Sequence, residues 1–264
     1  MRTRIIGAII GIAVLIPFVY LGSHPFAYGI LVVAILGLFE IARMKQIQYF
    51  NAIGLISSLA VALIVLPEHY NLSWITNFNS QFLFYLCGMA LLVLTVYGYK
   101  EINFEEVSVL MFAALYVGFG FRFIILIRDM GLITLAYLFV VIWATDIGAY
   151  FIGRTYGKHK LAPEVSPNKT IEGSIGGVLC AMLAGVVFVF IFQPNLGDTN
   201  HVWLLSIILS LVGQFGDLVE SALKRHFNVK DSGKFLPGHG GVLDRFDSLI
   251  FASFMFMIWL NLFQ

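Results

Sequence analysis

The sequence has little charge for its length. Only 12% of its 264 residues are Asp, Glu, Lys or Arg, 59% are hydrophobic, and the formal net charge is only +1. A soluble domain carries about twice this charged fraction. The low charge argues against a soluble enzyme, and the near-neutral balance gives no reason to expect a nucleic-acid partner.

Cysteine is scarce as well. Cys87 and Cys180 both lie inside apolar runs, and their spacing fits no metal-binding motif. We therefore expect two buried thiols that contribute to packing rather than to chemistry.

The chain has instead a series of apolar runs, each near the roughly 20 residues that a helix needs to cross a bilayer. Only intrahelical hydrogen bonds can satisfy the backbone in lipid, so each run is predicted to be a helix. The nine runs are residues 5–22, 26–42, 50–67, 81–99, 107–127, 131–152, 173–193, 201–223 and 247–263. The predicted fold class is all-α, a polytopic integral membrane protein with about nine transmembrane helices.

The positive residues predict the orientation. Fourteen of the sixteen Lys and Arg residues precede the first run or follow an even-numbered run, and only Arg122 and Arg128 lie near the other side. The positive-inside rule then places the N-terminus in the cytoplasm and the C-terminus outside. We expect a multi-pass protein of the cell membrane whose active site lies at the cytoplasmic face.

The two long cytoplasmic loops suggest a division of labour along the chain. Residues 1–130, with spans 1–5, are predicted to form a scaffold that faces lipid or a dimer partner. Residues 131–264, with spans 6–9 and both loops, are predicted to carry catalysis.

Charge is concentrated in residues 217–247, which hold ten of the 31 charged residues. Asp217, Glu220, Ser221 and Lys224 are spaced to share one face of a helix. A single charge at mid-bilayer costs about 3 kcal/mol on insertion scales, so this face must point into the bundle or a wet cavity. Asp217 is predicted to be functional. For Glu220 and Lys224, a function and a simple ion pair both remain open.

Two further aspartates follow on the last span. Asp217 near the end of one helix and Asp244 at the start of the next could hold a divalent ion, and oxygen ligands suit Mg²⁺. Asp247 is either a further ligand or the N-cap of the last helix.

The segment PGHGG precedes these aspartates. Gly238, Gly240 and Gly241 would let backbone amides approach phosphate oxygens closely. His239 is predicted either to contact phosphate or to stabilise the turn.

The loop after the sixth run adds a second group. Asp146 lies near the inner end of that run, and Lys169 lies in SPNKTIEG. Lys169 is predicted to be functional. Lys158 and Lys160 could neutralise substrate phosphates or meet anionic lipid headgroups.

The run SALKRHFNVKDSGKFLPGHGGVLDRFD, residues 221–247, closely resembles the signature of the phosphatidate cytidylyltransferases, or CDP-diacylglycerol synthases. A second block, TDIGAYFIGRTYGKHKLAPEVSPNKTIEG, is also similar to that family, with Asn168 as a departure from the commoner SPKKT. The matched signature positions are Ser221, Lys224, Arg225, Lys230, Asp231, Pro237, Gly238, His239, Gly240, Gly241, Asp244, Arg245 and Asp247. The specific resemblance covers residues 143–250.

The resemblance implies transfer of CMP from CTP to phosphatidic acid, which yields CDP-diacylglycerol and pyrophosphate in phospholipid biosynthesis. It also implies a requirement for one or two Mg²⁺ ions. The implied metal ligands are Asp217, Asp244 and Asp247. The candidate catalytic residues are Lys224, Arg225, Lys230, Asp231, His239 and Arg245. The candidate substrate-binding residues are Asp146, Lys169, Ser221, Gly238, Gly240 and Gly241.

Two other functions would account for part of the sequence. A CTP-dependent lipid kinase of the dolichol or phytol kinase type would use similar elements, but the ending PGHGG-x-x-DR-x-D favours the cytidylyltransferase. An ion-coupled transporter would explain Asp146 and Asp217 but would not need a glycine-rich loop. The expected partners are CTP, phosphatidic acid and the lipid bilayer, and a homodimer is left open.

Overall fold

A computed structural model describes residues 16–70, 79–197, 199–233 and 240–263. The chain forms two compact units. The first consists of residues 1–126 and 229–244, and the second of residues 127–228 and 245–264. These units are defined by packing, whereas the predicted boundary at residue 130 separates functions, so that boundary stays a prediction.

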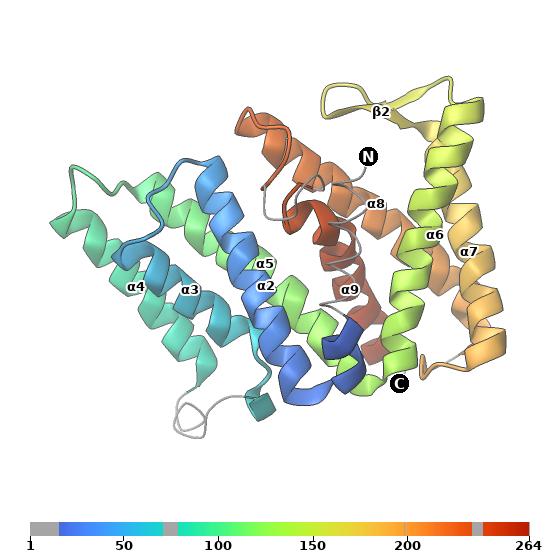
Figure 1. The fold of residues 1–264 in the computed structure, drawn as a ribbon, viewed down its shortest axis with the longest axis horizontal. Helices are drawn as coiled ribbons and strands as arrows, with labels where there is room; N and C mark the ends of the chain where they lie inside the picture. Colours follow the sequence, from blue (N-terminus) through green and yellow to red (C-terminus); the bar gives the residue numbers. More distant parts are fainter. Residues whose placement is uncertain (1–15, 71–78, 198, 234–239, 264) are drawn as a thin grey trace. The chain divides into compact units, whose positions relative to one another are not determined.

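The first unit is built from long apolar helices (Figure 1). Its helices are α2 (Ser23–Met44), α3 (Ala52–Val65), α4 (Ser80–Tyr97) and most of α5 (Phe104–Met130), with a short 3₁₀ helix at Glu68–Tyr70. The side chain of Asn51 accepts hydrogen bonds from the backbone N–H groups of Ile53 and Gly54 and so begins α3. Proline at position 67 disfavours helical backbone at Leu66, which explains why α3 is short.

The second unit pairs helices with a small hairpin (Figure 1). Its elements are most of α9 (Leu243–Phe263) together with α6 (Leu132–Tyr156), β1 (Lys160–Ala162), β2 (Ser166–Thr170), α7 (Ile171–Phe192), a 3₁₀ turn at Thr199–His201, and α8 (Val202–His226). Buried hydroxyl groups connect α6 to α8: Tyr137 with Ser206 at 2.9 Å, and Thr145 to Ser210 at 2.8 Å. Such interhelical hydrogen bonds are typical of helices that pack within a membrane.

The predicted class, a polytopic all-α membrane protein, is confirmed in this form. In the described part of the chain, seven helices are long and apolar enough to cross a membrane, namely α2 and α4 to α9. The third predicted span is a helix of 14 residues, about 21 Å long against a hydrocarbon core of about 30 Å. The first predicted span lies largely outside the described residues, so the count of nine stays a prediction.

The hairpin between α6 and α7 was not predicted. Strands β1 and β2 are antiparallel, with Lys160 opposite Thr170 and Ala162 opposite Ser166. The backbone N–H of Val165 donates to the carbonyl of Ala162 at 3.2 Å across a turn that begins with Pro163, a residue suited to the first corner of a turn. The 6–7 loop is therefore an ordered element rather than an irregular connection.

Candidate functional site

The second unit contains a cavity of about 520 Å³ at the hairpin end of α6, α7 and α8, which we call the polar cavity because most of the residues that line it have polar side chains. This volume falls within the range of about 300–1,000 Å³ that is typical of small-molecule sites. Its lining residues come from α6, the hairpin, α7 and α8: Asp146, Ala149, Tyr150, Gly153, Arg154, Leu161, Asn168, Lys169, Thr170, Gly173, Ser174, Gln214 and Asp217. The structure thus brings together three residues singled out from the sequence: Asp146, Lys169 and Asp217.

The hairpin delivers Lys169 to this cavity. Lys169 precedes Thr170, which is both the last residue of β2 and the N-cap of α7. The Thr170 hydroxyl accepts a hydrogen bond from the backbone N–H of Gly173 at 3.1 Å. Strand pairing on one side and a helix cap on the other therefore fix the backbone from which Lys169 extends.

Two of the residues that line the cavity form an ion pair. The distance between Lys169 Nζ and Asp217 Oδ2 is 2.5 Å, and the Ser221 hydroxyl donates to Asp217 Oδ1 at 3.3 Å. The side chains of Lys169 and Asp217 are 26% and 33% exposed. An ion pair this accessible adds little stability. Lys169 and Asp217 can therefore each leave the other and bind a charged ligand instead.

Asp247 belongs to the same electrostatic environment. Its charge interacts with those of Asp146 and Asp217, and with the positive charge of Lys224. Gly216 makes this neighbourhood possible, because a Cβ at that position would lie 2.5 Å from the backbone oxygen of Asp247. Helix α8 can therefore approach the first turns of α9 closely, one residue before Asp217.

The donors of this group suit Mg²⁺. Asp146, Asp217 and Asp247 offer hard carboxylate oxygens, and the negative charges outnumber the nearby Lys169 and Lys224. Among the described residues, no three His, Cys, Asp or Glu side chains are gathered closely enough to enclose a metal. Mg²⁺ commonly binds through one or two carboxylates, with water and substrate phosphates completing its shell. The residues therefore fit an ion that is shared with a phosphate ligand.

The last turns of α8 carry the next predicted residues. Lys224 forms an ion pair with Glu220 one turn earlier, and the Glu220 carboxylate is almost fully buried. The ion pair between these two residues is therefore present, and a function for Lys224 stays a prediction. Arg225 Nε donates to the carbonyl of Val165 in the hairpin turn at 3.3 Å. Arg245, at the start of α9, is exposed.

The remaining predicted residues lie in the first unit or outside the described residues. Lys230 and Asp231 are exposed, and Gly238 and His239 fall within residues 234–239, which are not described. The Asp244 carboxylate accepts hydrogen bonds from the backbone N–H of Ser232 at 2.9 Å and of Gly241 at 2.8 Å. Since Asp217 and Asp244 belong to different units, their joint metal site stays a prediction.

The structure corrects one interpretation of the last span. Asp247 is not the N-cap of α9, because that helix begins at Leu243, four residues earlier. Asp244 has a structural role besides its predicted one as a metal ligand. Asp244 lies in the first turn of α9 and organises the residues that lead into it.

Sequence reasoning missed several residues of the cavity wall. Tyr150 and Arg154 lie one turn apart on α6, and the Arg154 guanidinium donates to the Tyr150 hydroxyl at 3.1 Å. Gln214 reaches the carbonyl of Ser174 at 3.4 Å. An uncharged amide or hydroxyl in an apolar run gives only a weak signal, whereas Arg154 could have been found by its position, one turn beyond Tyr150 and two beyond Asp146.

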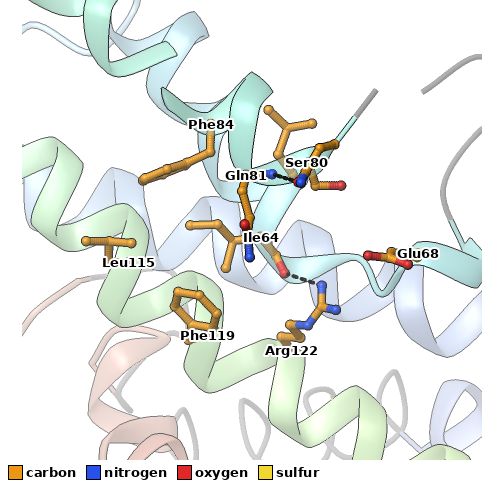
Figure 2. A pocket seen from close by; sticks show the side chains of 10 residues that line it. Ile64, Glu68, Ser80, Gln81, Phe84, Leu115, Phe119 and Arg122 are labelled. Carbon is orange, nitrogen blue, oxygen red and sulfur yellow. Dashed lines mark hydrogen bonds between the residues drawn. The ribbon is translucent and has the colours of Figure 1, made fainter. Parts of the chain in front are cut away.

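A second cavity, of about 650 Å³, lies in the first unit (Figure 2). Arg122 points from α5 toward the end of α3, where its Nη1 donates to the carbonyl of Ile64 at 3.1 Å (Figure 2). The same Nη1 donates to the carbonyl of Leu66, also at 3.1 Å. It thereby satisfies carbonyls that a helix end leaves unpaired. Among the described residues that line this cavity, Glu68 alone is acidic, so they offer no group of carboxylates comparable to that of the second unit.

The chain is similar to known proteins along nearly its whole length. The model of the cytidylyltransferase family matches residues 2–263. A phosphatidate cytidylyltransferase of Staphylococcus haemolyticus (strain JCSC1435) is 41% identical over 255 residues, covering 96% of each chain. One of Bacillus subtilis (strain 168) is 40% identical over 267 residues, covering 100% of this chain and 99% of its own. One of Staphylococcus aureus (strain COL) is 41% identical over 257 residues, covering 96% of each.

Proposed function

Because the chain belongs to the cytidylyltransferase family, as a phosphatidate cytidylyltransferase, we propose that the polar cavity of the second unit is where it joins CTP to phosphatidate. One observation carries this proposal. Asp146, Lys169 and Asp217 converge from three separate elements on one cavity large enough for a nucleotide. The resemblance found in the sequence had singled out the same three residues.

The reaction makes one bond and breaks one. A phosphate oxygen of phosphatidate attacks the α-phosphorus of CTP, and the bond from that phosphorus to the oxygen bridging to the β-phosphate breaks. CDP-diacylglycerol forms and pyrophosphate leaves. The nucleophile is already an anion, because the second pKa of a phosphate monoester is about 6. The protein therefore supplies position and charge, and needs no general base.

The cavity residues divide these tasks by charge. Lys169, released from Asp217 when an anionic ligand arrives, would hold a CTP phosphate, and Arg154 on the cavity wall is a second donor. Asp217 and Asp247 would hold Mg²⁺ against the substrate phosphates, with Asp244 as a further ligand. When bound, Mg²⁺ would neutralise charge that develops on the triphosphate. At the end of α8 nearest the hairpin, Lys224 is held by Glu220 and Arg225 by the carbonyl of Val165.

The lipid substrate requires a route from the bilayer. Several large apolar side chains of α6 and α8 beside the cavity are exposed, among them Ile147, Tyr150 and Phe215. In a membrane such a face meets acyl chains, so phosphatidate could enter laterally while CTP arrives from water. This arrangement suits a reaction between one lipid and one soluble nucleotide.

We also propose that the hairpin and the α8–α9 loop face the cytoplasm of a cell membrane. Both connections follow an inward-running helix if the N-terminus is cytoplasmic and nine spans are present. Both are rich in Lys and Arg, as the positive-inside rule requires. Cysteine labelling tests this orientation: a probe that cannot cross the membrane should label Thr199→Cys but not Lys160→Cys from outside intact cells. The opposite pattern would overturn it.

The reaction itself can be tested by placing a radiolabel on different phosphates of CTP. Purified protein is given phosphatidate, Mg²⁺ and CTP that is radiolabelled at either the α- or the γ-phosphate. A cytidylyltransferase moves the α-label into lipid and releases the γ-label as pyrophosphate. A lipid kinase would move the γ-label into lipid instead. Absence of α-label in lipid, under conditions where a Bacillus subtilis relative transfers it, would contradict the proposal.

A further inference from the structure

A buried carboxylate on α2 is not used by the function proposed above. Glu40 lies in a predominantly apolar helix, and only 3% of its surface is exposed. An acidic residue inside a membrane-spanning segment is costly unless its charge is compensated, and such residues commonly serve a function. Its partners therefore indicate what it does.

Within the described part of the chain, the Glu40 carboxylate forms its hydrogen bonds with the loop between α8 and α9 and with the first residue of α9. Its Oε1 accepts the backbone N–H of Val242 at 2.8 Å, and its Oε2 accepts that of Leu243 at 3.0 Å. These N–H groups lie at the start of α9, where no intrahelical acceptor is available. A carboxylate is also favoured there by the helix dipole. Glu40 thus acts as an N-cap for α9 that is supplied by another helix.

Ser232 connects Glu40 to Asp244. The fully buried Ser232 hydroxyl lies 2.9 Å from Glu40 Oε2 and 3.0 Å from Asp244 Oδ2. The Ser232 carbonyl accepts a hydrogen bond from Arg43 Nη2 at 3.0 Å, one turn along α2 from Glu40. One end of α2 therefore holds this loop both at Ser232 and where it joins α9.

Close packing leaves this arrangement little freedom. A Cβ at Gly241 would lie 2.4 Å from Glu40 Oε2 and would also overlap the Ser232 hydroxyl. Only glycine lets the backbone pass so near the carboxylate. We call the group formed by Glu40, Arg43, Ser232, Gly241 and Asp244 the loop anchor.

We propose that Glu40 is a positioning residue for the transfer reaction. By holding Ser232, Val242 and Leu243, it fixes the part of the signature loop from which Asp244 extends, and so sets the orientation of the Asp244 carboxylate. The proposal rests on the function proposed above, in which Asp244 contributes to phosphate or metal binding. Glu40 itself would touch no substrate.

The first test measures the anchor without any substrate or metal. Glu40→Gln keeps the shape of the side chain, but in either orientation its NH₂ group must face a backbone N–H, that of Val242 or that of Leu243. Hydrogen exchange of the peptide containing residues 241–243, measured in detergent, should become about tenfold faster as these bonds are lost. Glu105→Gln is the matched control, because Glu105 is an exposed acid of the same unit. Unchanged exchange in Glu40→Gln would overturn the anchor.

The second test measures the consequence for the reaction. In Glu40→Gln, the kcat for transfer of α-label from CTP should fall about tenfold. Half-maximal activity should need about fivefold more Mg²⁺, because the displaced Asp244 carboxylate acts through its charge at the phosphates. Glu40→Asp keeps the charge on a shorter side chain and should recover part of both effects. It also carries the test if Glu40→Gln does not fold. An unchanged Mg²⁺ response in a variant with faster exchange would overturn the positioning role.

The two arms also separate this proposal from the proposed function. Wild-type protein that transfers no α-label would contradict the cytidylyltransferase reaction, while hydrogen exchange would still decide whether Glu40 holds the loop. If the wild-type protein transfers α-label but Glu40→Gln responds to Mg²⁺ as Glu105→Gln does, the positioning role alone is contradicted.

Discussion

The carboxylates of the polar cavity and those of the loop anchor are compensated in different ways. In the cavity, Asp217 faces the Nζ of Lys169, and both side chains remain accessible. In the loop anchor, Glu40 is buried and accepts two backbone N–H groups and a hydroxyl. The Lys169 ammonium group is carried by a long side chain, so a ligand can take its place beside Asp217. The backbone N–H groups that Glu40 binds cannot leave without unfolding the loop. The difference separates residues suited to binding from residues suited to holding a conformation.

The largest expected effect tests the cavity side of this comparison. Asp217→Asn keeps the side-chain shape and removes the charge, so kcat should fall by about 10²- to 10³-fold, as for loss of one electrostatic contact in a transition state. The unfolding temperature should change little, because the ion pair with Lys169 is accessible. Glu164→Gln, an exposed acid in the hairpin turn, is the control. A near-wild-type rate in Asp217→Asn would remove this residue from the site.

The next effect concerns the partner of Asp217. Lys169→Met should raise the KM for CTP and lower kcat/KM by about 10- to 100-fold, because a phosphate contact is lost. When Lys169→Met and Asp217→Asn are combined, the loss in kcat/KM should be smaller than the product of the two separate losses, since the residues are in direct contact. Lys160→Met on β1 provides a matched control in the same hairpin. Strictly multiplicative losses would show that the two residues act independently.

A moderate effect is expected where the loop turns. Gly240 has a φ of +82°, and a Cβ there would lie 2.5 Å from Asp244 Oδ2. Gly240→Ala should therefore lower the free energy of unfolding by about 1–2 kcal/mol, the usual penalty for a left-handed residue. Denaturant unfolding in detergent measures this. Gly88→Ala, whose Cβ would meet only the flexible end of Met111, should be tolerated, and an equal loss in both variants would contradict the explanation.

The smallest effect concerns the N-cap that holds the hairpin. Thr170→Ala removes the acceptor for the Gly173 N–H and should destabilise the protein by about 1 kcal/mol. Thr170→Ser keeps the hydroxyl and should restore most of that stability. Thermal unfolding of both variants provides the measurement, and equal unfolding temperatures would show that the cap contributes nothing.

Much of the fold follows from the sequence because lipid imposes a simple rule on it. Helices α4 to α9 coincide with predicted apolar runs to within a few residues. Helix α3 is shorter than predicted because Asn51 begins it and Pro67 limits its end, two local signals that hydropathy alone ignores. The hairpin was missed because strands of three and five residues are too short to produce a clear alternation of apolar and polar residues.

The site was predictable in part for a similar reason. Asp146 and Asp217 are charged residues in apolar surroundings, and Lys169 lies in a distinctive segment, so each could be singled out. Glu40 is equally unusual in an apolar run and could have been found by the same rule. Its partner could not, because no spacing in the sequence predicts a contact between residues 40 and 232. Glu40 also holds the start of α9 at Leu243 through a long-range contact, and for this reason the N-cap stayed one of two alternatives for Asp247.

The most direct measurement asks whether CTP occupies the polar cavity. Ser174 lines this cavity, so Ser174→Cys places a thiol in its wall once Cys87 and Cys180 have been replaced by alanine. Lys160→Cys on the exposed edge of the hairpin is the control in the same background. We predict that saturating CTP with Mg²⁺ slows alkylation of Ser174→Cys by about tenfold and leaves Lys160→Cys unchanged. Equal alkylation of Ser174→Cys with and without CTP, in a variant that still transfers the α-label, would contradict the placement of the active site.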